Sequence, residues 1–252
     1  MAVPVSLAAH FSGQRRLLAS HRGWDPGAAA LARRLGQVLA VTPTMGRFSR
    51  LVVDLNRSLH HRQVVGPSLQ RLSGRDRRQL LASLWASYRL RVLASVVAGW
   101  ADRRASVVHW SVHTFTPMMA QRVRPTDLGI LFDPGRPRER QLAQAARCRV
   151  QAVLPGWQVD FNRPYRGRSD GLTTALRAAC GRRYLGLEIE VNQRHVARGF
   201  AGGGVGWQQA CRLLAAALAA STLSSPGPLA AAVGLENAGR IGPPGKRPRG
   251  RP

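Results

Sequence analysis

The sequence is short of acidic residues, cysteine and lysine, and these shortages exclude several classes of protein. Its 252 residues include 12 acidic side chains, three cysteines and a single lysine, Lys246. Cys148, Cys180 and Cys211 are an odd number at wide, unmatched spacings, which excludes a disulfide framework and a zinc-finger pattern. We therefore expect the protein to lie in a reducing compartment and to be cytoplasmic.

Long hydrophobic runs are also missing. The most apolar stretch, residues 213–235, is interrupted by Ser221, Ser224, Ser225, Pro226 and Pro228, whereas a membrane-spanning helix needs roughly 20 predominantly apolar residues in a row. The N-terminal Met-Ala-Val-Pro-Val carries no basic region ahead of an apolar run, as a signal peptide would. The sequence predicts neither a signal peptide nor contact with a membrane.

Arginine is in large excess. The 38 basic residues give a formal net charge of +26, and a clustered basic face would attract nucleic-acid phosphates. The arginines are spread from Arg15 to Arg251, however, alongside much Ala, Gly, Pro and Leu. This spread favours a composition bias in which arginine replaces lysine. We expect no nucleic-acid binding beyond nonspecific attraction to a basic tail.

Short β-rich runs alternate with helical patterns, which is typical of an α/β domain. We predict strands over residues 50–55, 106–112, 128–132, 150–154 and 184–191, and helices over 26–40, 80–92, 139–147, 169–180 and 207–220. A Gly-rich loop is predicted over 199–206. Beyond Ser221 the chain is rich in Ser, Gly, Pro and Ala and ends in a basic run. We therefore predict one domain over 1–221 and a disordered tail over 222–252.

Two of the scarce acidic residues lie on one face of a predicted strand. In Tyr-Leu-Gly-Leu-Glu-Ile-Glu-Val at 184–191, alternation places Glu188 and Glu190 on the face opposite the apolar residues. A sheet covered on both faces would bury them, at a cost that a charge partner or a metal would offset. The alternative is an edge strand whose polar face pairs with arginines.

Further candidate residues stand at element boundaries. His113 follows the predicted strand 106–112, a usual location of ligand sites in α/β folds, although a lone histidine there is often structural. Asp25 precedes Pro26, so helix capping alone would explain it. Arg50 begins the predicted strand 50–55 and Arg57 follows it, and their guanidinium forks suit an acidic substrate. Each of them could equally be a surface charge or a partner of Asp54.

Six segments, taken in order, resemble the N-formylglutamate amidohydrolase family. They are His-Arg-Gly-Trp-Asp-Pro-Gly-Ala at 21–28, Ser-Arg-Leu-Val-Val-Asp-Leu-Asn-Arg-Ser at 49–58, Val-His-Thr-Phe-Thr-Pro at 112–117, Arg-Pro-Thr-Asp-Leu-Gly-Ile-Leu-Phe-Asp at 124–133, Asn-Arg-Pro-Tyr-Arg at 162–166 with Ser-Asp-Gly-Leu-Thr at 169–173, and Leu-Glu-Ile-Glu-Val-Asn-Gln at 187–193. The resemblance implies a single three-layer αβα domain with a mixed sheet, similar to zinc-dependent exopeptidases. It also implies a Zn2+ cofactor and hydrolysis of a linear amide in a small acidic N-acyl amino acid, such as N-formyl-L-glutamate, to formate and glutamate.

The resemblance assigns roles to individual residues. It implies that His113 is a metal ligand, that Asp25 is a ligand or supports one, and that Glu188 is the general base. In such chemistry zinc activates a water molecule and a carboxylate moves its proton to the leaving amine. The remaining matches, Arg50, Asn56, Arg57 and Arg163, would bind the substrate. Glu190 has no assigned role, because many relatives carry a basic residue there.

One departure from the family bears on activity. Relatives begin with a His-containing segment that supplies the first metal ligands, and Ala2-Val-Pro4 resembles the end of that segment. We therefore expect either that the start of the chain has been assigned too late or that the protein is a truncated, inactive member. Two alternatives to an active enzyme stay open: a non-catalytic member that binds a small acidic ligand, and a basic nucleic-acid-binding protein.

Overall fold

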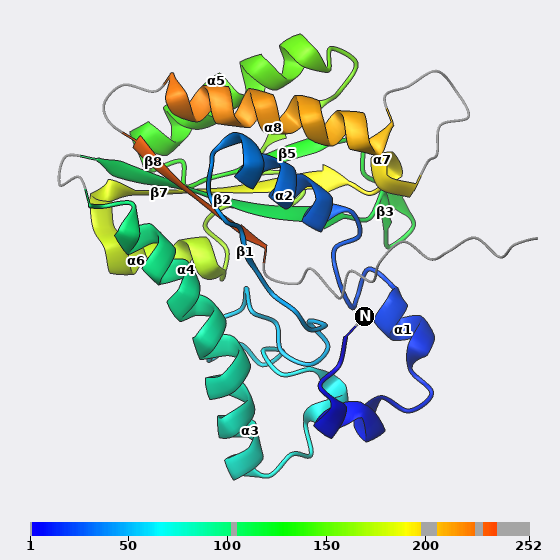
Figure 1. Cartoon of the computed structure of the whole chain (residues 1–252). Helices are drawn as coiled ribbons and strands as arrows, with labels where there is room; N and C mark the ends of the chain where they lie inside the picture. Colours follow the sequence, from blue (N-terminus) through cyan, green and yellow to red (C-terminus); the bar gives the residue numbers. More distant parts are fainter. Residues whose placement is uncertain (1, 102–104, 198–205, 225–228, 236–252) are drawn as a thin grey trace, which may run out of the picture.

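A mixed β-sheet with helices on both faces forms the upper body of the molecule (Figure 1). The computed structural model describes residues 2–101, 105–197, 206–224 and 229–235. The strands lie in the order β1-β8-β2-β7-β5-β6, and neighbours are parallel except for β5, which is antiparallel to β7. Their bounds are β1 (Thr44–Met45), β2 (Ser106–Phe115), β5 (Leu128–Leu131), β6 (Val159–Phe161), β7 (Tyr184–Asn192) and β8 (Leu229–Leu235), and a separate hairpin is formed by β3 (Met118–Met119) and β4 (Arg122–Val123).

Helices cover the sheet on both sides, which confirms the three-layer α/β prediction. One face is covered by α2 (Ala28–Val38), α5 (Pro137–Val153) and α8 (Trp207–Leu223), and the other by α4 (Ser87–Ala98) and α6 (Leu172–Cys180). The shorter helices are η1 (Val5–Phe11), α1 (Arg15–Ala19), η2 (Pro67–Leu69), α3 (Gly74–Leu80), η3 (Leu81–Ala86), η4 (Gly181–Arg183) and α7 (Arg194–Ala197). We call residues 2–24 and 46–86 the lower lobe, because they extend below the sheet in Figure 1.

Strict alternation along the two central strands divides their side chains between two cores. On β2, Val108, Trp110 and Val112 lie in the apolar core under α2, α5 and α8, as do Leu187 and Ile189 of β7. The intervening residues lie on the opposite face of the sheet, where Val107 and Tyr184 join a second apolar core that we call the lower-lobe core. Because β7 pairs with β2 on one side and β5 on the other, Glu188 and Glu190 do share a face, and the edge-strand alternative is wrong.

Two of the predicted strands are not strands, and one predicted strand end is misplaced, each for an identifiable reason. Residues 50–55 form turns with an isolated bridge between Val53 and Val65, because their apolar side chains enter the lower-lobe core without a neighbouring strand. Residues 150–153 continue α5, since Val150 lies on its buried face. His113 lies inside β2 and not beyond it, because pairing with β7 extends to Phe115.

The predicted tail is wrong for residues 229–235, which form β8 in the interior of the sheet between β1 and β2. Its run of small residues, Leu-Ala-Ala-Ala-Val-Gly-Leu, has little intrinsic strand preference. Packing decides its conformation, because Val233 and Leu235 are buried in the upper core. Residues 236–252, and most of the loop predicted over 199–206, lie outside the described residues.

The helical segment Gly74–Ala98 runs without interruption through α3, η3 and α4. By length and composition alone it is apolar enough to cross a membrane. Leu80, Tyr88, Val92 and Val96 on one side of it are buried in the lower-lobe core. Its π-helical stretch, η3, is of the kind that often occurs at functional sites.

Candidate active site

Asp25 connects three segments that are distant in sequence. Its carboxylate is buried, with 3% of the residue exposed. Oδ2 lies 3.0 Å from Nδ1 of His113 on β2, and Oδ1 accepts a hydrogen bond from Nη2 of Arg50. The capping role expected for Asp25 is wrong, because α2 begins at Ala28 with Gly27 as its N-cap residue and no side-chain cap.

Ser111 engages the other nitrogen of the His113 ring. Its Oγ lies 3.0 Å from His113 Nε2, and both residues are at most 5% exposed. Since both ring nitrogens have partners, the orientation of the imidazole is fixed. Sequence reasoning missed Ser111, although its position two residues before His113 on a strand places both side chains on one face.

The acidic pair of β7 lies opposite these residues. In the sheet register Glu188 faces Ser111 and Glu190 faces His113. Glu188 is half-buried, and its Oε1 accepts a 2.5 Å hydrogen bond from the Thr173 hydroxyl near the start of α6. Sequence reasoning assigned no role to Thr173, although it ends one of the six matching segments. The hydroxyl fixes the direction of the carboxylate that was predicted to act as the base.

Glu190 is a buried carboxyl group in an unfavourable setting. It is 6% exposed, and its Oε2 has no hydrogen-bond partner among the described residues. Burial raises the pKa of Glu190 to about 8. His113 and Arg50 oppose this shift, whereas the carboxylates of Asp25 and Glu188 add to it. At neutral pH the group is therefore mainly protonated, which indicates that it can donate a hydrogen bond or a proton.

Arg50 completes the cluster. Burial by itself would lower the pKa of its guanidinium, but Asp25, Asp54, Glu190 and the Tyr165 phenol raise it. One side of Arg50 is held by Asp25, whereas its buried Nε has no hydrogen-bond partner among the described residues. Buried polar atoms are rarely left without partners. Arg50 Nε and Glu190 Oε2, in one cluster, therefore indicate room for a polar ligand.

The other predicted substrate-binding residues lie around this cluster. Asn56 Oδ1 accepts a 2.7 Å hydrogen bond from Leu172 N, at the start of α6. Arg57 is half-buried, its Nε lies 3.9 Å from Asp54 Oδ2, and its Nη1 donates a hydrogen bond to the Asp170 carbonyl. Asn56 therefore ties its loop to the first residue of α6, and Arg57 ties it to the segment just before α6. Whether they also bind substrate stays a prediction.

Arg163 lies on the loop after β6. Its side chain is exposed, and its backbone crosses β5 so closely that a Cβ atom at Gly129 would lie 1.9 Å from the Arg163 carbonyl oxygen. Gly129 pairs with Glu190 in the sheet. The loop therefore passes beside the acidic cluster, and glycine at position 129 allows this approach.

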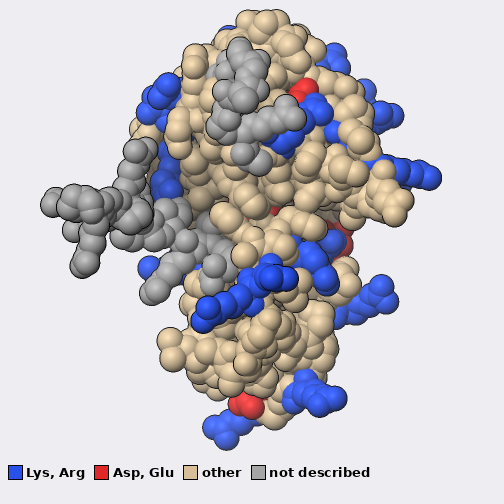
Figure 2. Space-filling model, turned by 90° about the vertical axis from the view of Figure 1, so that its right-hand side faces the viewer, with Lys and Arg blue, Asp and Glu red and all other residues tan. Residues whose placement is uncertain are grey.

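Basic side chains lie on both the upper body and the lower lobe in Figure 2, and acidic atoms are visible at the junction between them. The candidate residues come from both sides of that junction, with Arg50 in the lower lobe and His113 in the sheet. In this view the arginines do not form a single continuous face.

The comparisons with known proteins identify the family. The family model for N-formylglutamate amidohydrolase matches residues 1–197. The chain belongs to the N-formylglutamate amidohydrolase family. All of the candidate residues, from Asp25 to Glu190, lie within the matched range, and this membership indicates a hydrolase. No match was found among curated proteins.

Solved structures share the fold of this family member. The Agrobacterium tumefaciens gene product Atu2144 is 27% identical with a TM-score of 0.71, and the alignment covers 88% of this chain and 86% of that one. An N-formylglutamate amidohydrolase from Ralstonia eutropha JMP134 is 17% identical with a TM-score of 0.57, over 77% of this chain and 79% of that one. The predicted α/β architecture with a mixed sheet is confirmed.

Proposed function

We propose that this protein hydrolyses the linear amide of a small N-acylated acidic amino acid, with N-formyl-L-glutamate as the first candidate substrate. One observation carries the proposal. Arg50, Asp25 and His113 form a largely buried chain of contacts beside Glu188 and Glu190. Two atoms of the cluster, Arg50 Nε and Glu190 Oε2, have no hydrogen-bond partner within the part of the chain that the structure describes. Clustered titratable groups with unmet hydrogen bonds are typical of catalytic sites.

The proposed cofactor is zinc, held in part by His113 and Asp25. Ligands of one tetrahedral zinc ion lie about 3.3 Å apart, given zinc–ligand bonds of about 2.0–2.2 Å. His113 Nδ1 and Asp25 Oδ2, 3.0 Å apart, are close enough to share an ion. The Ser111 hydroxyl on His113 Nε2 supplies the supporting contact that ligating histidines usually have.

These two ligands are fewer than the three that catalytic zinc sites normally use. Among the described residues, no group of three or more His, Cys, Asp or Glu side chains is arranged to hold a metal ion. When bound, zinc would polarise the amide carbonyl and increase the acidity of a water molecule. The remaining roles belong to the protein's own residues.

We assign proton transfer to the acidic pair. Glu188, oriented by Thr173, would accept a proton from the attacking water and deliver it to the departing amine nitrogen. Glu190, protonated near neutral pH, would donate a hydrogen bond inside the cluster. Arg50 Nε, which has no partner among the residues that the structure describes, would bind a substrate carboxylate while Asp25 holds the other side of the guanidinium.

The test is formate release by the purified full chain, with N-formyl-L-glutamate compared with N-formyl-L-alanine, together with zinc content by mass spectrometry. We expect formate from the acidic substrate and bound zinc. His113→Ala should lose both, whereas His60→Ala, a change away from the cluster, should lose neither. Zinc-free protein that releases no formate would overturn the proposal. Tight binding of N-formyl-L-glutamate without turnover would support the non-catalytic alternative.

A further inference from the structure

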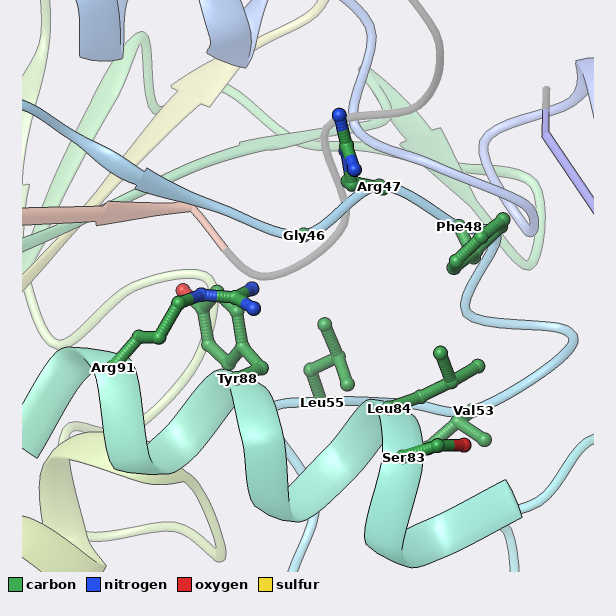
Figure 3. Close-up of a pocket in the computed structure, with 9 residues that line it drawn as sticks. All are labelled: Gly46, Arg47, Phe48, Val53, Leu55, Ser83, Leu84, Tyr88 and Arg91. Carbon is green, nitrogen blue, oxygen red and sulfur yellow. The ribbon is translucent and has the colours of Figure 1, made fainter. Parts of the chain in front are cut away.

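A separate pocket lies between the loop 46–55 and the helices η3 and α4 (Figure 3). Its volume is about 200 Å³, which exceeds the roughly 150 Å³ of a protein cavity known to admit benzene. In Figure 3, Gly46, Arg47 and Phe48 form one side of the pocket, and Ser83, Leu84, Tyr88 and Arg91 form the other. The space is large enough for an aromatic ring or a short alkyl chain.

The loop separates this pocket from the candidate active site. Val53 and Leu55 line the pocket, whereas Asp54, between them, interacts with Arg57 and contributes to the charge environment of Arg50. None of the residues placed in the catalytic cluster lines the pocket. A ligand bound here would therefore contact the other side of the segment that carries Arg50.

The lining combines an apolar surface with two arginines and contains no acidic residue. Phe48, Val53, Leu55 and Leu84 supply the apolar part. Arg47 is exposed and makes no ion pair or hydrogen bond through its side chain with any described residue. Arg91 contacts the face of the Tyr88 ring, with 5.9 Å from its guanidinium carbon to the ring centroid, and has no described acidic partner. The charge on this pocket is therefore uncompensated by its lining.

We propose that this pocket binds a small amphiphilic carboxylate, with an aryl or short alkyl group against Phe48 and Leu84 and its carboxylate at Arg91. The Arg47 side chain points away from Arg91 in Figure 3, so it adds positive charge at the rim without contacting the same carboxylate. A planar carboxylate matches the fork of a guanidinium group, and the apolar lining gains from removing a hydrocarbon group from water. A neighbouring groove of about 470 Å³ shares Phe48, Ser83 and Leu84 with the pocket. Longer apolar groups can extend along this groove.

The test measures binding of three probes to the full chain by calorimetry. 3-Phenylpropionate carries both features, 3-phenylpropan-1-ol lacks the charge, and acetate lacks the apolar group. We expect 3-phenylpropionate to bind at least about tenfold more tightly than either of the other two, because a hydrogen bond to a charged group contributes measurably to affinity. Equal affinity for the alcohol or for acetate would overturn the proposal.

Variants and a location measurement separate this pocket from the active site. Arg91→Gln should weaken 3-phenylpropionate binding about tenfold, and Arg47→Gln should weaken it less, whereas Arg62→Gln, an equivalent change at an exposed arginine outside the lining, should not weaken it. In NMR spectra the probe should shift the backbone amides of Phe48, Leu84 and Tyr88. Shifts confined to Asp25 and His113, or unchanged affinity in the Arg47→Gln, Arg91→Gln double variant, would contradict the proposal. Neither result depends on amidohydrolase activity.

Discussion

Asp127 and Glu190 are two buried acidic residues with opposite surroundings; Asp127 directly precedes β5, and Glu190 lies on the neighbouring strand β7. Asp127 accepts hydrogen bonds from Gln158 N at 2.8 Å and from Arg194 Nε at 2.9 Å, and it also contacts His195. Burial alone would raise the pKa of Asp127, but these three partners lower it below its ordinary value. Glu190 Oε2 has no partner among the described residues, and burial raises the pKa of Glu190 to about 8.

The difference separates a structural acid from a functional one. Asp127 ties the start of β5 to the residue that precedes β6 and to the segment that follows β7, so its hydrogen bonds stabilise the fold. Glu190 sits beside His113, Asp25 and Glu188, where its own burial costs free energy. A buried carboxyl oxygen that has no hydrogen-bond partner among the described residues is more readily explained by a role toward a ligand.

The largest difference between the acidic cluster of Glu188 and Glu190 and the surroundings of Asp127 should appear in catalytic activity. Glu188→Gln removes the proposed base, so we expect kcat to fall about 10²- to 10⁴-fold, the usual contribution of general acid–base catalysis. The Thr173 hydroxyl can still donate to the amide oxygen, so the fold should survive. Formate release from N-formyl-L-glutamate and thermal unfolding are the measurements. Asp127→Asn serves as the control and should keep kcat unchanged. Wild-type turnover in Glu188→Gln would refute the assigned role.

The next contrast is the pH dependence of stability in the metal-free protein. The folded-state pKa of Glu190 is raised to about 8, above its ordinary value, so the folded protein retains a proton that the unfolded chain has released. Stability should therefore fall between about pH 4.5 and pH 8, by at most about 1.4 kcal/mol per pH unit from this group. Glu190→Gln should remove that slope. Urea unfolding across this pH range tests the prediction, and an identical slope in both proteins would contradict it.

The contribution of Asp127 to folding stability should change with pH in the opposite direction to that of Glu190. Its folded-state pKa is lowered, so its contribution is present above the ordinary pKa of an aspartate and is lost as the pH falls through the lowered value. Asp127→Asn should reduce the free energy of unfolding at pH 7 by about 1.5–3 kcal/mol, because hydrogen bonds to a charged group are lost. Urea unfolding at pH 7 and at pH 3 tests this. The difference between variant and wild type should shrink at the lower pH, and a constant difference would be evidence against it.

Local sequence patterns predicted the three adjacent strands β2, β7 and β5, but neither the other three strands of the sheet nor the contacts that make the site. The alternation of Leu, Ile and Val with Glu188 and Glu190 fixes their common face, because side chains along a strand alternate strictly. No local pattern links Asp25 to Arg50, 25 residues away, since that contact depends on how the lower lobe packs against the sheet. For the same reason β8 escaped prediction: its alanines become a strand only between β1 and β2.

Substituting Arg57 should have the smallest effect on stability and activity. It tests whether a partly exposed arginine beside the buried acidic cluster contributes to substrate binding. The Arg57 side chain is 40% exposed and lies 3.9 Å from Asp54, so its ion pair contributes at most about 1 kcal/mol to stability. If Arg57 also binds a substrate carboxylate, Arg57→Gln should raise KM for N-formyl-L-glutamate about fivefold or less, with kcat unchanged, because the lost interaction is present equally in ground and transition states. The Arg62→Gln control should leave KM unchanged. An unaltered KM in Arg57→Gln would restrict Arg57 to its contacts with Asp54 and Asp170, and Arg50 would then be the arginine to test next for carboxylate recognition.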